Sequence, residues 1–139
     1  MILRLTKKFT FDMAHALKGY DGKCQNIHGH TYHLFVTIEG VPLNDPNSPK
    51  NGMVTDFGDI KRLVNEVIVE KFDHALVLSK DSPYNLNIPT KSIITDFQPT
   101  TENLLMHFAQ LLQPCLPAGT KLYSMRLHET ETSYAELFL

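Results

Sequence analysis

The fold is decided near the start of the chain, by the stretch Leu3-Arg4-Leu5-Thr6-Lys7-Lys8-Phe9-Thr10-Phe11-Asp12-Met13-Ala14-His15. Its odd positions are apolar except for Lys7 and His15, and its even positions are mostly polar. Because successive side chains of a strand point to opposite faces, this period of two predicts a half-buried strand that ends at His15. A histidine therefore lies at the end of the strand, on the face that is otherwise apolar.

The remaining elements follow from periodicity and from turn residues. Apolar residues alternate again from Tyr32 to Ile38, and this pattern predicts a second strand after the turn-like residues 19–23. Apolar residues at helical spacing predict helices over about 58–71 and from Thr100 to Pro114, the second one capped by Thr100. Two final strands fit 120–129 and 132–139. The order strand, strand, helix, helix, strand, strand predicts an α+β fold, with a single domain over residues 1–139.

The bulk composition excludes several classes of function. The chain has 139 residues, 42% hydrophobic and 20% charged, with a net charge of −2. This balance offers no electrostatic case for a nucleic-acid or membrane partner. We find neither an apolar run of about 18 residues nor a signal peptide, so we expect a cytoplasmic protein. In a reducing compartment Cys24 and Cys115 are expected to be free thiols, with Cys115 a buried structural residue.

Three histidines form the candidate metal site. His28-Gly29-His30 leads into the second strand, and residues two apart on an extended chain point the same way. If the two strands pair antiparallel, His15 lies beside this pair. Three imidazoles without a fourth protein ligand describe an open zinc site, in which water or substrate takes the last position. The alternative is that the histidines are merely polar residues at a strand end.

Cys24 precedes His28 by four residues. A thiol beside a dication has its thiolate favoured, so Cys24 is either a fourth ligand or a base or nucleophile. The alternative is a buried structural cysteine.

Carboxylates and one further histidine complete the candidate site. Asp73-His74 follows the first helix and can shuttle a proton, or can simply end the helix. Glu129 lies at the end of a predicted strand, on the side that is otherwise apolar. A carboxylate in this position needs a hydrogen-bond donor, which the N–H groups of a ligand would supply. The alternative is that the strand has already reached solvent at Glu129. Thr101 and Glu102 begin the second helix and are either cap residues or ligand contacts.

Together these motifs resemble the 6-pyruvoyltetrahydropterin synthase family. The resemblance runs from about Phe9 to Tyr134 in the right order, and it rests on Phe11-x-x-x-His15, Cys24-x-x-x-His28-Gly29-His30, Asp73-His74, Pro99-Thr100-x-Glu102-Asn103 and Glu129-Thr130. Three residues separate the cysteine from His-Gly-His, as in the bacterial branch of the family, the 6-carboxytetrahydropterin synthases of the queuosine pathway.

The resemblance implies a tunnelling fold, an antiparallel sheet with two helices packed on one face. It also implies a homo-oligomer, a hexamer of two stacked trimers, with active sites at subunit interfaces. Zn²⁺ would be held by His15, His28 and His30, and its open position would take the side-chain oxygens of a pterin substrate, 7,8-dihydroneopterin triphosphate. Triphosphate and acetaldehyde would leave, and 6-carboxy-5,6,7,8-tetrahydropterin would remain.

The same resemblance implies a role for each remaining residue. Cys24 would be the general base that removes a side-chain proton, assisted by a relay of Asp73 and His74. Glu129 would anchor the pterin ring, with Thr101 and Glu102 nearby. One departure is the stretch 80–98, which is longer than in compact members of the family and which we expect to form a lid or a subunit contact.

Three alternatives remain open from the sequence. The same scaffold could eliminate triphosphate only and give 6-pyruvoyl-tetrahydropterin. A non-catalytic zinc- or pterin-binding protein would use Cys24 as the fourth ligand. A folate-pathway variant that makes 6-hydroxymethyl-dihydropterin usually carries Glu near the cysteine position, and Cys24 argues against it.

Overall fold

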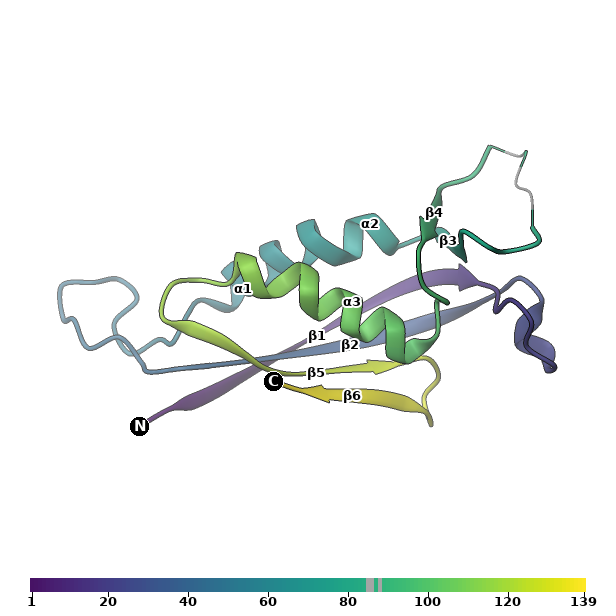
Figure 1. Cartoon of the computed structure of the whole chain (residues 1–139). Helices are drawn as coiled ribbons and strands as arrows, with labels where there is room; N and C mark the ends of the chain where they lie inside the picture. The colour runs from purple at the N-terminus through teal and green to yellow at the C-terminus, as the bar shows by residue number, and fades with distance from the viewer. Residues whose placement is uncertain (85–86, 88) are drawn as a thin grey trace.

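The computed structural model describes residues 1–84, 87 and 89–139. One mixed sheet of six strands carries the helices on one face (Figure 1). The strands lie in the order β4-β3-β1-β2-β5-β6. Their bounds are Leu3–His15 for β1, His28–Gly40 for β2, Ala75–Ser79 for β3, Ser92–Thr95 for β4, Thr120–His128 for β5 and Tyr134–Phe138 for β6.

The long hairpin of β1 and β2 confirms the predicted pairing. The two strands are antiparallel over their whole length, with His15 opposite His28 and Met13 opposite His30. The odd positions of β1 and the even positions of β2 form the buried face, as the alternation predicts. Register is strongly specified here, because a slip of one residue would turn every apolar side chain to the other face. The same register places the three histidines at one end of the hairpin.

Two helical segments cover this buried face. The first runs without a break through α1 (Phe57–Val64), a π-helical stretch (Asn65–Val69) and α2 (Glu70–Phe72), close to the predicted 58–71. The second, α3 (Thr101–Leu112), begins at the predicted N-cap, where the Thr100 side chain accepts a hydrogen bond from the backbone N–H of Asn103. Aromatic side chains join the layers: Phe11 of β1 packs edge-on against Phe108 of α3, with ring centroids 6.1 Å apart.

Strands β3 and β4 were not predicted. Strand β3 is parallel to β1, and β4 is parallel to β3. Every residue of β3 is buried, and its first four residues, Ala-Leu-Val-Leu, form a continuous apolar run without the period of two. Strand β4 belongs to the stretch 80–98, so part of that stretch extends the sheet. The predicted lid or subunit contact was assigned to the whole stretch 80–98. Residues 85, 86 and 88 of that stretch lie outside the described residues.

Cys115 was expected to be buried, and this prediction is wrong. It is exposed, in the short 3-10 turn that follows α3, and both cysteines are free thiols. Pro114 lies in this 3-10 turn, just beyond the last residue of α3, where a proline cannot continue an α-helix. In the described part of the chain, no helix combines the length and apolar character needed to cross a membrane.

Candidate metal centre and active site

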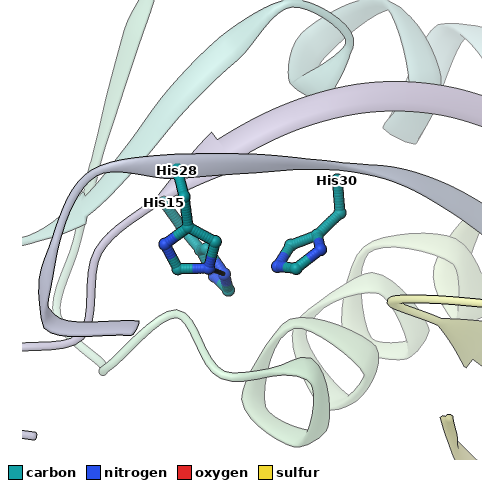
Figure 2. Close-up of side chains that lie close together, drawn as sticks. All are labelled: His15, His28 and His30. Carbon is teal, nitrogen blue, oxygen red and sulfur yellow. Dashed lines mark hydrogen bonds between the residues drawn. The ribbon is translucent and has the colours of Figure 1, made fainter. Parts of the chain in front are cut away.

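The side chains of His15, His28 and His30 converge on one point at the end of the β1–β2 hairpin (Figure 2). The Nε2 atoms of His15 and His28 are 3.1 Å apart. One ring nitrogen from each histidine lies within 4.8 Å of the others. A tetrahedral zinc ion with bonds of about 2.0–2.1 Å holds two imidazole nitrogens about 3.3 Å apart, close to the observed separation.

Backbone carbonyls fix the proton on two of these rings. Nδ1 of His15 lies 2.7 Å from the carbonyl oxygen of Pro99, and Nδ1 of His28 lies 2.7 Å from that of Asn26. A carbonyl oxygen can only accept, so each Nδ1 carries the proton and each Nε2 of a neutral ring presents a lone pair. Two lone pairs therefore face each other across 3.1 Å. A shared cation would satisfy both of them.

The environment of His30 and the lowered pKa values of two of the histidines are also consistent with a metal site. Nε2 of His30 is buried and has no hydrogen-bond partner among the described residues. Burial lowers the pKa of His15, against the opposing effects of the Pro99 carbonyl and Glu129. Burial likewise lowers the pKa of His30. The rings of His15 and His30 are therefore neutral near pH 7 and available as ligands. A set of imidazole donors without a carboxylate favours zinc over harder ions.

Glu129 lies beside two of the histidines. Its Oε1 is 3.4 Å from Nε2 of His15 and 3.5 Å from Nε2 of His30. It directly follows β5, on the buried parity that the sequence predicts. Glu129 also lines a pocket of about 150 Å³ together with the other two residues predicted to bind substrate, Thr101 and Glu102 at the start of α3. One carboxylate thus borders both the metal centre and the pocket.

Cys24 lies in the 3-10 turn Lys23–Gln25, between the strands that carry the histidines. It is half-buried, and its carbonyl accepts a hydrogen bond from the backbone N–H of Leu17. Burial is the main reason why the pKa of Tyr32 is raised, and electrostatic interactions with Glu129 and with Cys24 raise this pKa further. The Tyr32 hydroxyl lies 3.5 Å from Nδ1 of His15. The thiol is therefore within electrostatic range of the residues that surround the metal centre.

Asp73 and His74 lie on the other face of the sheet. Oδ1 of Asp73 accepts hydrogen bonds from Nδ1 of His74 at 2.9 Å and from the backbone N–H of Asp12 at 3.0 Å. The Asp73 side chain therefore ties the helix end to β1, beyond any role in ending the helix. His74 lines a cavity of about 520 Å³ with Asp12, Ala14 and Thr31, whose parity is opposite to that of the three histidines, and His30 also contributes to its lining. The contacts of Asp73 and His74 with Asp12 place this pair beside the face of β1 opposite to the His15 side chain.

His74 also has an unusual backbone. Its φ is 59°, and it is the one non-glycine residue with positive φ in the described ranges. This left-handed conformation costs a residue with a side chain roughly 1–2 kcal/mol. Such strain persists only where the surroundings hold it, and it clusters at functional sites. The conformation singles out the Asp73–His74 turn independently of its residue types.

The sequence predicted nine functional residues, and the structure places eight of them in three groups: the three histidines, the adjoining pocket, and the Asp73–His74 pair on the opposite face. Cys24 lies in the turn beside the histidines. It also adds residues that sequence reasoning missed. Pro99 and Asn26 act through backbone carbonyls, which leave no sequence signal. Asp12 is one polar residue among the even positions of β1, and only the side-chain distances reveal that it joins Asp73 and His74 within 4.8 Å.

Comparisons with known proteins identify relatives of this chain. Residues 4–138 match the family model described as 6-pyruvoyl tetrahydropterin synthase. The chain is 38% identical to 6-carboxy-5,6,7,8-tetrahydropterin synthase of Haemophilus influenzae, over 97% of this chain and 98% of that protein. It is 35% identical to human 6-pyruvoyl tetrahydrobiopterin synthase, over 94% of this chain and 79% of that protein. The structure of Caenorhabditis elegans 6-pyruvoyl tetrahydropterin synthase shares the fold, with a TM-score of 0.69 at 24% identity over 100% of this chain and 96% of that one.

Proposed function

Since this chain belongs to the 6-pyruvoyl tetrahydropterin synthase family, we propose that it is a zinc-dependent 6-carboxy-5,6,7,8-tetrahydropterin synthase. It would convert 7,8-dihydroneopterin triphosphate and water to 6-carboxytetrahydropterin, acetaldehyde and triphosphate, a carbon–carbon lyase reaction that serves queuosine biosynthesis. The Haemophilus influenzae relative that carries this name is similar over nearly the whole of both chains. The observation that carries the metal-dependent chemistry is the pair of Nε2 lone pairs that face each other between His15 and His28.

The metal centre supplies electrophilic chemistry. Zinc held by His15, His28 and His30 would act as a Lewis acid on the oxygens of the substrate side chain and make the neighbouring C–H groups more acidic. Glu129 does not belong to the group of donors within 4.8 Å. Among the described residues the three imidazoles therefore leave a position for substrate, as an open catalytic site requires.

Cys24 is the proposed base. Its thiolate would remove the activated side-chain proton, a role that suits a thiol whose anion is favoured beside a cation. A free thiol is required for this role, and a reducing compartment preserves it. We therefore propose a cytoplasmic enzyme.

Glu129 is the proposed anchor of the pterin ring. An ionised carboxylate can accept two parallel hydrogen bonds from the amino group and the ring N–H of a guanidine-like edge. Its pocket at the start of α3 holds Thr101 and Glu102. Because Glu129 also lies within 3.5 Å of two metal ligands, a ring bound there would extend its side chain toward the metal centre.

Asp73 and His74 are the proposed proton relay, and their place on the opposite face constrains how they act. The two side chains contact Asp12, whose side chain has the parity opposite to that of His15 on β1. We propose that Asp73 and His74 serve the active site of a neighbouring copy, with active sites at subunit interfaces of a homohexamer of two trimers. Nδ1 of His74 is paired with Asp73 at 2.9 Å, so its Nε2 is the atom free to exchange a proton with the thiol.

The experiment that tests the function is incubation with 7,8-dihydroneopterin triphosphate, followed by mass identification of the products. We expect acetaldehyde and 6-carboxytetrahydropterin. Similarity to human 6-pyruvoyl tetrahydrobiopterin synthase makes a pyruvoyl product the second candidate. A pyruvoyl product without acetaldehyde would establish that candidate, and zinc binding without any turnover would leave only a binding protein.

A further inference from the structure

Lys91 contacts the turn that carries Asp73 and His74. It directly precedes β4, and its backbone carbonyl accepts a hydrogen bond from the N–H of Leu76, so it lies beside the start of β3. Its side chain reaches back to the end of the first helical segment. Nζ of Lys91 donates to the carbonyl oxygen of Glu70 at 2.6 Å and to that of Asp73 at 2.8 Å. A cation at a helix C-terminus is favoured by the helix dipole, and hydrogen bonds from a charged donor are the strong ones.

The peptide group between Asp73 and His74 is held at both of its polar ends. Its carbonyl oxygen accepts from Nζ of Lys91, and its N–H donates to the carbonyl oxygen of Asp12 at 2.6 Å. This peptide group leads into the positive φ of His74. Without the lysine, one of the two restraints that oppose rotation of the peptide is lost. A rotation there would move the His74 imidazole away from the Asp73 carboxylate.

We propose that Lys91 is a positioning residue, which holds the Asp73–His74 pair in the orientation needed for proton relay. This inference rests on the proposed function, because it supposes that the pair acts in catalysis. It also assigns a role to the stretch 80–98: a residue from that stretch braces the turn between α2 and β3. The side chains that surround the pair are Asp12 and Thr31 from the sheet, and Lys91 itself; Thr31 donates to the Asp12 carboxylate at 2.6 Å.

The kinetic test compares Lys91→Met, which keeps the aliphatic stem, with Lys91→Arg, which restores a cationic donor. Lys80→Met is the matched control, an exposed lysine of the same stretch. A misplaced catalytic group loses rate and leaves substrate binding intact, so we expect kcat of Lys91→Met to fall roughly 10- to 100-fold. KM should stay within about twofold, since the pair does not bind the pterin. Lys91→Arg should recover most of the rate, and Lys80→Met should match the wild type. Zinc content should be unchanged in all three variants.

A spectroscopic test is independent of turnover. In the wild type, Nδ1 of His74 donates to Asp73, so ¹⁵N NMR of histidine-labelled protein near pH 8 should show the Nδ1–H tautomer. The resonance is assigned by its absence in His74→Gln. We expect Lys91→Met to shift this imidazole toward the Nε2–H tautomer, and Lys91→Arg to keep the wild-type signal. A folded Lys91→Met that keeps the Nδ1–H tautomer overturns the proposal.

The two proposals fail in distinguishable ways. If the wild type produces neither acetaldehyde nor a pyruvoyl product, the proposed function fails, and the NMR comparison still decides whether Lys91 holds His74. If the wild type is active and Lys91→Met turns over like Lys80→Met, the role of Lys91 is refuted and the proposed function stands. An equal rate loss in Lys91→Arg, or an effect on KM alone, also counts against positioning. Should Lys91→Met not fold, Lys91→Gln replaces it in both tests.

Discussion

Nδ1 of His15 donates to the carbonyl oxygen of Pro99 across 2.7 Å, one residue before the Thr100 N-cap of α3. The same short segment therefore orients a proposed metal ligand and begins the helix that lines the Glu129 pocket. Figure 2 shows this segment passing beside the three imidazoles on its way into α3. The proposed metal site and the proposed ring-binding pocket thus share one structural support.

Thr100→Ala should weaken that support. Loss of an N-cap side chain costs roughly 1 kcal/mol, so the melting temperature should fall by about 2–8 °C. KM for the pterin should rise as well, because Thr101 and Glu102 form the first turn of α3. The matched control is Asp56→Ala, which removes the N-cap of α1, where Asp56 accepts from the N–H of Gly58 at 2.7 Å. It should lower the melting temperature without changing KM; equal KM values in both variants would contradict the link.

His28→Ala should abolish zinc binding. It removes one of three donors, and no other described donor lies within 4.8 Å of all three rings. We expect about one zinc per chain in the wild type and little in the variant after dialysis, measured by inductively coupled plasma mass spectrometry. His33→Ala is the control, since His33 has the opposite parity on β2 and contacts Thr10. Equal zinc content in the two variants would exclude this centre.

Cys24→Ala should keep zinc and lose turnover. Removal of a general base typically costs 10²- to 10⁴-fold in rate, and we expect a loss of that size in kcat. Zinc analysis and product formation are measured on the same preparation. Loss of zinc together with activity would instead make Cys24 the fourth ligand, as the non-catalytic alternative requires.

Glu129→Gln should weaken binding of the pterin ring. A hydrogen bond to a charged group contributes roughly 1.5–3 kcal/mol, so we expect KM to rise about 10- to 100-fold. Glu131→Gln, an exposed carboxylate in the turn between β5 and β6, is the control and should leave KM unchanged. Tight binding of a pterin to Glu129→Gln, measured by fluorescence titration, would show that the ring is anchored elsewhere.

The metal-free protein should lose stability in mild acid. Burial lowers the pKa of His15 and of His30 in the folded state, whereas an unfolded imidazole keeps a pKa near 6.5. Below about pH 6.5 the unfolded chain takes up protons that the folded chain excludes, so stability falls as pH falls toward the lowered pKa values. The melting temperature of chelator-treated protein should therefore be lower at about pH 5.5 than at about pH 7.5. His15→Gln should reduce that difference; an unchanged difference would contradict the assignment.

The central hairpin could be predicted from the sequence because the pattern of apolar and polar residues within each strand determines which side of that strand is buried. Alternation in β1 and β2 specifies both the buried face and the register, and the register alone brings His15 opposite His28. The N-cap at Thr100 has a comparably local signature. The parity of Glu129 also follows from alternation along β5.

Other features depend on contacts between distant segments and could not be predicted. Strand β3 is buried on both faces, so its sequence lacks alternation. The position of Asp73 and His74 follows from their contacts with Asp12, which lies 61 residues before Asp73 in the sequence. Lys91 resembles any surface lysine until its ammonium group is seen beside the Glu70 and Asp73 carbonyls.

The position of Asp73 and His74 beside Asp12, on the sheet face opposite to the His15 side chain, has a consequence for mixtures of variants. A chain without the thiol still carries an intact relay, and a chain without the relay still carries an intact thiol. If each active site combines the two from different copies, Cys24→Ala and His74→Gln chains, inactive when pure, should complement each other once co-assembled. The specific activity would then require the assembled oligomer and would fall when dilution dissociates it into subunits. An active site built from one chain would not show this dependence on protein concentration.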